Sequence, residues 1–478
     1  MKNLMKKTKI VATLGPASSS PFMVTTLLKK GVNIFRINFS HGTHQQHAET
    51  IKKIRAAGEK LGIFPAIMAD LQGPKIRTGC TANNAPVTLR KGKTITITTK
   101  KILCTDTELC VDYPKLLNEI SKGQDILIND GLIRLRALSI DLKTSKCLCR
   151  VLNTGKYSSH KGVNFPNTDL SIPPLTAKDR KDLDFILTQD INIIALSFVR
   201  KAQDLHPLKK ILKKSNKDAL VIAKIEKPEA ADHVKDIIKE CDGIMVARGD
   251  LGVETSPFEI SMIQKNLITV ANEYGKIVIV ATQMLESMIE HPFPTRAEST
   301  DVTNAILDGA DALMLSAETA SGIYPVEAVE MMSNIARSTE TSKYYSSKIH
   351  HLCLKTHYPP HAICDAAAWA SSDLGNVPVI LFTQSGETAW YLSKIRNQSE
   401  IYAFSPDISV VNSLSMAWNT TPFLLKDDPS PIAQQHNAEN ILLKKKFIKK
   451  NDIVLVVSGK SFAKGSTNAL RVKKVGED

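Results

Sequence analysis

The feature that most constrains the fold is an alternation of short apolar segments with amphipathic stretches of helical period. Eight segments rich in Val and Ile have the length of buried strands, and helical patterns such as 259–274 and 325–339 follow nearly every one. Repeated strand–helix units of this kind pack with parallel strands, and eight of them close into a (β/α)8 barrel. The predicted fold class is therefore α/β with a TIM barrel, whose strands are 9–13, 33–38, 66–70, 192–197, 220–225, 243–247, 277–282 and 312–316.

Two parts of the chain depart from this alternation. Residues 72–167 lack helical period and carry short β segments separated by Gly turns, which predicts an inserted small β-barrel domain. The double proline at 173–174 makes a stiff return to the barrel. Residues 341–478 hold five further strands with helical patterns between them, which predicts a C-terminal α/β sandwich. The catalytic barrel would then comprise residues 1–71 and 168–340.

Composition limits the classes of partner. A net charge of +14 is compatible with a nucleic-acid partner, with anionic small substrates, or with solvated lysine faces. The last interpretation is favoured for the lysines at 444–450, which alternate with apolar residues, and no nucleic-acid-binding motif accompanies the charge. No apolar run reaches the length of a membrane helix, and the eight cysteines are scattered as in proteins of a reduced compartment. We therefore expect a cytoplasmic protein with neither a membrane nor a nucleic-acid partner.

Polar side chains gather at the predicted carboxyl ends of the strands. In a (β/α)8 barrel these ends converge on one mouth, where catalytic residues lie. Polar groups within apolar strands are costly, so their clustering there indicates a site. The residues are Arg36, Asn38, Ser40, Asp70, Lys224, Glu226, Arg248, Asp250, Thr282, Ser316 and Glu318.

The pair Lys224 and Glu226 is the most informative of these. At strand spacing i, i+2 the two side chains point the same way. Glu226 and Asp250 come from adjacent predicted strands, so their oxygens could share one divalent cation, and two carboxylates with substrate oxygens suit Mg²⁺, or Mn²⁺ in its place. The alternative is a buried structural ion pair, which the number of other polar strand ends disfavours.

Positive charge and alignment are what phosphoryl transfer requires of a protein. Arg36, Lys224 and a metal would supply the charge, while Arg77 and Lys161, near the two ends of the insert, could close over a nucleotide together with His41. The alternative for these last three is exposed loop cations and a structural histidine. No Walker-type or kinase glycine loop appears, which favours metal-mediated holding.

A second anion site is predicted after the sixth strand. The backbone N–H groups of Gly249 and Asp250 could bind a carboxylate, as helix N-termini do. Thr282 would add a hydroxyl to the same anion.

Several long motifs occur in the order typical of one family. They are TKIVATLGPAS at 8–18, RINFSHG at 36–42, IAKIE at 222–226, MVARGDLG at 245–252, ATQMLESM at 281–288 and MLSAETA at 314–320. Over nearly its whole length the chain resembles the pyruvate kinase family. The resemblance implies transfer of the phosphoryl group of phosphoenolpyruvate to ADP, giving pyruvate and ATP in the last step of glycolysis, usually by a homotetramer.

The resemblance also implies roles for individual residues. Glu226 and Asp250 would bind Mg²⁺, and Lys224 and Arg36 would bind the moving phosphoryl group. Gly249, Asp250 and Thr282 would hold the pyruvate carboxylate, and Thr282, Ser316 and Glu318 would form the network that protonates the enolate. The nucleotide would contact Arg36, Asn38, His41, Arg77 and Lys161 under a closing insert.

Position 75 bears on the monovalent cation. Many family members require K⁺ near the residues that match Asn38, Ser40, Asp70 and Leu71, and carry an acidic residue where this chain has Lys75. Members with lysine there tend not to need K⁺, since an ammonium can replace a monovalent cation. We therefore predict that turnover does not depend on K⁺.

A second phosphate cradle is predicted in the C-terminal part. Residues 383–388, TQSGET, resemble the effector loop of the family, and Thr383, Ser385, Gly386 and Thr388 would bind a phosphorylated sugar or a nucleotide monophosphate that activates the enzyme. The alternative is a simple helix N-cap by Ser385.

Two rival functions remain open on the sequence. One is a Mg²⁺-dependent aldolase or mutase acting on an enolpyruvate, which would not need the insert or the C-terminal part. The other is an inactive basic protein that binds RNA or a sugar phosphate.

Overall fold

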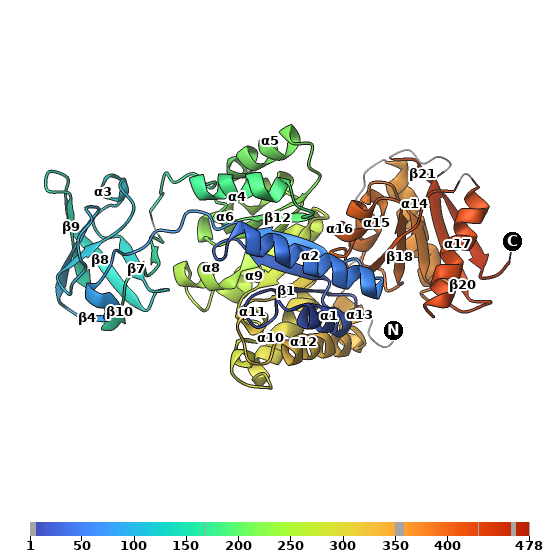
Figure 1. The fold of residues 1–478 in the computed structure, drawn as a ribbon, viewed down its shortest axis with the longest axis horizontal. Coiled ribbons are helices and arrows are strands. Elements are labelled where there is room, and N and C mark those ends of the chain that lie inside the picture. The colour runs from blue at the N-terminus through green and yellow to red at the C-terminus, as the bar shows by residue number, and fades with distance from the viewer. Residues whose placement is uncertain (1–5, 167, 349–357, 429, 460–464, 478) are drawn as a thin grey trace.

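The computed structural model describes residues 6–166, 168–348, 358–428, 430–459 and 465–477, so the predicted boundary at Asn167 lies outside the described residues. Figure 1 shows three parts in a row, with an α/β barrel in the middle, an all-β insert at one end and a C-terminal α/β part at the other. Among the helices within these ranges, none is long and apolar enough to cross a membrane.

The central part is a closed barrel of eight parallel strands. Going around the barrel, the order is β1, β16, β15, β14, β13, β12, β3 and β2. Their bounds are Lys9–Thr13 (β1), Ile34–Asn38 (β2), Ala66–Asp70 (β3), Ile193–Leu196 (β12), Leu220–Ile225 (β13), Gly243–Ala247 (β14), Ile277–Ala281 (β15) and Ala312–Leu315 (β16). The eight predicted strands are thereby confirmed to within two residues at each end.

Two hydrophobic clusters hold the barrel together. One fills its interior with alternate strand residues such as Val11, Met68 and Ile279, and the other packs the outer strand faces against the helices. The covering helices are α1 (Pro21–Lys30), α2 (His44–Leu61), α4 (Ala177–Leu187), α5 (His206–Lys214), α6 (Pro228–Asp232), α7 (Val234–Lys239), α8 (Arg248–Glu254), α9 (Ile260–Glu273), α10 (Arg296–Asp308), α11 (Ala317–Ala320) and α12 (Pro325–Glu340).

Local chemistry sets the ends of these helices. The hydroxyls of Thr43 and Thr295 accept hydrogen bonds from the backbone at N3 and form capping boxes at the starts of α2 and α10. Gly31 ends α1 with φ 107°, a left-handed conformation that glycine adopts without strain. Gly31 is therefore the C-cap of α1.

The insert contains a six-stranded mixed sheet and a two-stranded sheet. The larger has the order β11, β7, β8, β9, β5 and β6, and the smaller pairs β10 with β4. Side chains from both sheets, including Leu89 and Tyr157, share one core. The bounds are Val87–Leu89 (β4), Thr94–Thr98 (β5), Glu108–Cys110 (β6), Asp125–Ile128 (β7), Ile133–Asp141 (β8), Lys146–Val151 (β9), Gly155–Tyr157 (β10) and Val163–Asn164 (β11), with the short α3 at Leu116–Glu119.

The C-terminal part is a five-stranded sheet with helices. The strand order is β19, β18, β17, β20 and β21, and only β21 is antiparallel to its neighbour. The bounds are Val379–Phe382 (β17), Ile401–Ser405 (β18), Thr420–Leu424 (β19), Ile453–Gly459 (β20) and Thr467–Lys474 (β21), and the helices are α13 (Lys343–Lys348), α14 (Pro359–Asp373), α15 (Glu387–Lys394), α16 (Ile408–Leu414) and α17 (Pro431–Lys444).

Buried ion pairs join this part to the base of the barrel. Asp311, the residue before β16, lies 2.5 Å from Nζ of Lys394, the last residue of α15, and 2.9 Å from Nη2 of Arg396, which follows that helix. All three side chains are almost fully buried. The carboxylate is therefore the electrostatic link between the barrel and the C-terminal sheet.

Candidate active site at the mouth of the barrel

Arg36 and Asp70 form the first layer of the mouth. Arg36 leaves β2 and donates from Nε to Oδ2 of Asp70 at 2.7 Å, with Nη2 at 2.6 Å from the same oxygen. Nη1 of Arg36 also donates to the hydroxyl of Thr13 at 3.1 Å. The contacts of Nε and Nη2 orient the planar guanidinium across the strand ends.

Lys224 lies beside this pair. Its Nζ is 2.8 Å from Oε1 of Glu226, 3.3 Å from Oδ1 of Asp70, and donates to the hydroxyl of Ser197 at 2.8 Å. Burial alone would lower the pKa of Lys224, but the carboxylates of Asp70 and Glu226 raise it above its ordinary value. The two carboxylates thus favour the charged ammonium of Lys224 in a buried site.

Opposing effects act on the pKa of the Glu226 carboxyl. Burial raises the pKa of its carboxyl; Lys224 lowers it, and the nearby charge of Asp250 raises it further. Its second oxygen accepts the backbone N–H of Phe198 at 2.7 Å, where the chain turns with φ 56°. Glu226 and Asp250 are therefore two carboxylates close enough to repel each other, and a divalent cation between them would remove that repulsion.

This pair fits a cation that takes only part of its ligands from protein. Among the residues that the structure describes, no three His, Cys, Asp or Glu side chains gather into a potential metal site. Mg²⁺ keeps several waters and binds through one or two carboxylates plus substrate oxygens. The donor set at Glu226 and Asp250 matches that preference.

The predicted carboxylate site is built around Thr282. The hydroxyl of Thr282 accepts the backbone N–H of Gly249 at 2.7 Å and donates to the carbonyl of Ala281 at 2.6 Å. Thr282 has φ 68°, so β15 ends one residue before the predicted position 282 and the hydroxyl turns toward α8. Arg248 donates to the carbonyl of Thr282 and pairs with Asp301 at 2.6 Å, so it supports the turn.

Ser316 and Glu318 lie at the end of β16. Oε2 of Glu318 accepts the backbone N–H of Ser316 at 2.7 Å, and its other oxygen accepts the N–H of Leu285 at 3.3 Å. Burial raises the pKa of Glu318, whereas these two hydrogen bonds lower it. The Ser316 hydroxyl is buried and has no hydrogen-bond partner within the described residues, so it remains available to a substrate or water.

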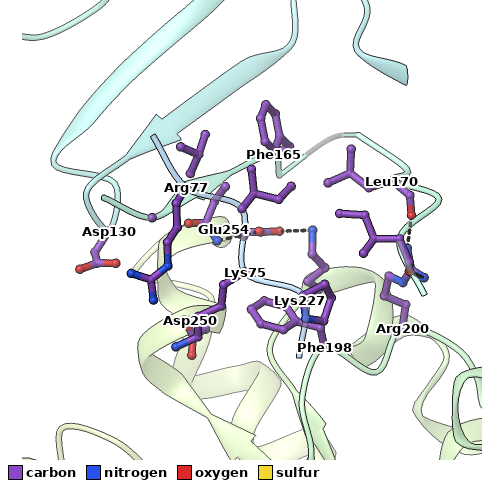
Figure 2. A pocket seen from close by; sticks show the side chains of 16 residues that line it. Lys75, Arg77, Asp130, Phe165, Leu170, Phe198, Arg200, Lys227, Asp250 and Glu254 are labelled. Atoms are coloured by element: carbon purple, nitrogen blue, oxygen red, sulfur yellow. Dashed lines mark hydrogen bonds and ion pairs between the residues drawn. The ribbon is translucent and has the colours of Figure 1, made fainter. Parts of the chain in front are cut away.

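The insert contributes the opposite wall of the mouth. A cavity of about 200 Å³ lies between the insert and the barrel. Figure 2 shows Arg77 and Asp130 together, with Lys75 and Asp250 close to each other below them. Arg77, predicted to reach a nucleotide, therefore lines the same space as the proposed metal ligand Asp250.

The other two residues predicted to contact nucleotide, Lys161 and His41, make hydrogen bonds through their backbones. Lys161 is held through its backbone, whose N–H donates to the hydroxyl of Thr78 at 2.9 Å. His41 is exposed just beyond β2, where its N–H donates to the carbonyl of Asn38 at 3.4 Å. Neither residue is among those that line the cavity between the insert and the barrel.

The residues predicted for a monovalent cation are also engaged. Oδ1 of Asn38 accepts the backbone N–H of Ser40 at 3.0 Å, and the Leu71 carbonyl accepts the Ser197 hydroxyl at 2.7 Å. Arg36 and Lys224 already neutralise Asp70: burial would raise its pKa, but these two cations lower it below the ordinary value. Lys75 is exposed at the cavity wall.

The predicted effector loop lies at the start of α15. Gly386, with φ 82°, is the N-cap and its N–H donates to the hydroxyl of Thr383 at 3.0 Å. The alternative of an N-cap by Ser385 is therefore wrong, because Gly386 occupies that position. The Thr388 hydroxyl is buried against that of Thr467 on β21, 3.0 Å away.

Sequence reasoning missed several residues of the mouth. Thr13, Ser197 and the backbone of Phe198 contact Arg36, Lys224 and Glu226. Ser197 is the last residue of the predicted strand 192–197, so its place at a carboxyl end was a usable signal. The contact of Phe198 has no such signal, because it is made by backbone.

Comparisons with known proteins agree with this geometry. The family model for the pyruvate kinase barrel domain matches residues 5–329, and that for the pyruvate kinase alpha/beta domain matches residues 361–473. The chain is 40% identical to pyruvate kinase of Staphylococcus saprophyticus, covering 99% of this chain and 81% of that protein, and 42% identical to pyruvate kinase of Agrobacterium vitis, covering 98% and 97%. A crystal structure of a pyruvate kinase from Cryptosporidium parvum superposes with a TM-score of 0.92 at 34% identity, covering 98% of this chain and 96% of that one. The chain belongs to the pyruvate kinase family, and its reaction is transfer of the phosphoryl group of phosphoenolpyruvate to ADP, giving pyruvate and ATP.

Proposed function

We propose that this transfer takes place between Lys224, Arg36 and the carboxylate pair Glu226 and Asp250. The observation that carries the proposal is the buried ammonium of Lys224, held 2.8 Å from Glu226 and 3.3 Å from Asp70. A fixed charge in a water-poor site stabilises a moving phosphoryl group without reorganisation during the reaction. Arg36, on β2, would hold the same phosphate.

Glu226 and Asp250 would hold the divalent ion, Mg²⁺ or Mn²⁺. The ion supplies positive charge to the phosphate and enolate oxygens when it is bound. Around it, Gly249, Asp250 and Thr282 hold the carboxylate of the organic substrate. The Gly249–Thr282 hydrogen bond supports this assignment because it brings the two groups together. Both donors would turn from their present acceptors, the Thr282 hydroxyl and the Ala281 carbonyl, to the substrate carboxylate.

Thr282, Ser316 and Glu318 form the proposed proton-transfer network. Support comes from the unpartnered Ser316 hydroxyl and from the carboxyl of Glu318, whose pKa burial raises. A buried acid of raised pKa retains a proton closer to neutral pH than an exposed one does. The network would deliver that proton to the enolate carbon and so complete pyruvate.

The insert would act as a lid over the nucleotide. Arg36, Asn38 and His41 would meet ADP from the barrel, and Arg77 and Lys161 from the insert. The cavity between Arg77 and Asp250 supports this arrangement. Closing the lid would exclude water from the transferring group.

The proposed function also includes regulation, assembly and the response to K⁺. Residues 383–388 would bind a phosphorylated effector, the enzyme would be a cytoplasmic homotetramer, and K⁺ would not be required because Lys75 supplies the charge. The hydrophobic clusters support division of the chain into a barrel at 1–71 and 168–340, an insert at 72–167 and a C-terminal part at 341–478. The insert has a cluster of its own, the barrel and the C-terminal part have two each, and Tyr345, Met416 and Trp418 of the C-terminal part join the barrel clusters. If Ser385→Asp changes neither the basal rate nor the response to sugar phosphates, the loop is not an effector site.

A lactate-dehydrogenase-coupled assay with phosphoenolpyruvate and ADP tests the proposal. We expect turnover that disappears on chelation of divalent ions and returns with Mg²⁺ or Mn²⁺. Glu226→Gln and Asp250→Asn should each raise the Mg²⁺ concentration at half-maximal rate. Unchanged turnover after removal of both metals would rule out the carboxylate pair as the centre of the site.

A further inference from the structure

Glu254 joins three segments at the edge of the cavity. It is the last residue of α8, and its side chain is only 2% exposed. Oε1 accepts Nδ2 of Asn164 at 3.0 Å, and Oε2 lies 3.1 Å from Nζ of Lys227. Figure 2 shows the Glu254 carboxylate facing the ammonium of Lys227.

Lys227 and Glu254 each lie shortly after a proposed metal ligand in the chain. Lys227 directly follows Glu226, while Glu254 follows Asp250 by four residues, which is about one helical turn. The Lys227–Glu254 ion pair therefore bridges the two segments that carry the proposed metal ligands.

Asn164 belongs to the insert. It lies on β11, next to Val163, whose N–H donates to the carbonyl of Ile76 at 3.0 Å. One residue further, Gly162 pairs with Arg77. A displacement of Asn164 would therefore displace Arg77 as well.

The burial of Glu254 makes these contacts interdependent. A buried carboxylate needs its charge compensated and its oxygens hydrogen-bonded. Asn164 satisfies one oxygen from the insert, and Lys227 compensates the charge from the barrel. If the insert moved away, Glu254 would lose one of its two partners.

We propose that Asn164, Lys227 and Glu254 form a latch, and that they are positioning residues for the reaction. The latch sets the closed position of the insert and couples it to the spacing of Glu226 and Asp250. Nucleotide binding under the insert and divalent-ion binding at the barrel thereby favour each other. This inference rests on the proposed assignment of the divalent site and of the nucleotide lid.

Asn164→Ala in the full-length enzyme is the central test, because it removes the insert's side of the latch without leaving a new charge. We expect the KM for ADP and the half-saturating Mg²⁺ concentration each to rise roughly tenfold, the loss typical of one hydrogen bond to a charged group. The KM for phosphoenolpyruvate at saturating Mg²⁺ should change far less. Hydrogen exchange should become faster in β11 and at residues 76–78, with a nearly unchanged melting temperature.

Lys227→Met and Lys227→Arg extend the test from the barrel side. The methionine variant should show the same two shifts, and the arginine variant should restore ADP and Mg²⁺ dependence toward wild type. The control is Glu108→Gln, which breaks a half-exposed ion pair with Lys146 on the far strands of the insert. It should leave all these readouts at wild-type values.

The outcomes separate the latch from the proposed function. If the wild type turns over and Asn164→Ala keeps the wild-type KM for ADP, Mg²⁺ dependence and exchange, the latch is wrong and the proposed site stands. A Tm loss in Lys227→Met without any shift in ADP or Mg²⁺ dependence would also overturn it, since that is what a merely structural ion pair predicts. If the wild type shows no turnover, the proposed function fails, and unchanged exchange in Asn164→Ala would still refute the latch.

Discussion

The ammonium nitrogen of Lys224 lies 3.3 Å from Oδ1 of Asp70, although strand β12 separates their strands in the barrel wall. Arg36 holds the other oxygen of the same carboxylate. Asp70 therefore contacts both cations proposed to bind phosphate, Lys224 and Arg36. These two contacts set the distance between the two cations. Burial lowers the pKa of Lys224, but the carboxylates of Asp70 and Glu226 raise it and so favour its charged form.

Replacing Lys224 with Met should abolish most of the turnover. Loss of one preorganised charged donor is expected to lower kcat by about a hundredfold or more. The coupled assay measures this, with Lys209→Met as the control, since Lys209 forms a partly exposed pair with Glu240 on the outer surface. If Lys224→Met turned over at the wild-type rate, the proposed role of Lys224 in phosphoryl transfer would be wrong.

Thr282 offers a test of the carboxylate site. Thr282→Val removes the acceptor of the Gly249 N–H while keeping the side-chain volume, so kcat should fall at least about tenfold. Thr282→Ser retains the hydroxyl and should stay close to wild type. Equal rates for the two variants would show that the hydroxyl has no part in the reaction.

Lys75 should decide the response to K⁺. In tetramethylammonium buffer, added K⁺ should change the wild-type rate little, because the lysine ammonium already supplies positive charge at the cavity wall. Lys75→Glu should lower the rate in that buffer and make it rise many-fold with K⁺. Strong stimulation of the wild type by K⁺ would contradict the prediction.

Asp311 should matter for stability. Asp311→Asn leaves the buried cations Lys394 and Arg396 without their carboxylate, and breaking a buried pair in this way costs about 3–5 kcal/mol. Urea unfolding should show a lower midpoint. Glu330→Gln is the control: it breaks an exposed pair with Lys30 and should cost less than about 1 kcal/mol. Equal midpoints for the two variants would argue against a linking role for Asp311.

His47 should make the protein less stable in mild acid. The ring of His47 packs on that of Phe39, with 4.4 Å between the ring centroids. Burial lowers the pKa of His47, and its hydrogen bond with the His41 backbone raises the pKa by a smaller amount. Below the ordinary value of 6.5 the unfolded chain binds more protons than the folded one, so stability falls as the pH drops. The melting temperature should therefore decrease more between pH 7.5 and 5.5 in the wild type than in His47→Gln. An identical decrease would show that His47 is not the group responsible.

The sequence alone determined the strands of the barrel and the identity of most residues at its mouth. Apolar runs such as 243–247 and 277–281 are almost wholly buried strands, and period and length suffice to recognise such segments. Polar residues at their ends could be assigned to one mouth because a parallel barrel brings all carboxyl ends together. Local chemistry likewise determined the helix stop at Gly31.

Only the tertiary structure decided which of these groups contact each other. The approach of Lys224 to Asp70, the turn at Thr282 with φ 68°, and the pairing of Asp311 with Lys394 join positions far apart in the chain or depend on local backbone geometry. Sequence patterns report the period and burial of single elements, whereas such contacts depend on register, on the closure of the barrel and on how separate cores pack. For the same physical reason, nothing in the order of residues linked Asn164 to Glu254, whose contact exists only because the insert folds back onto the barrel.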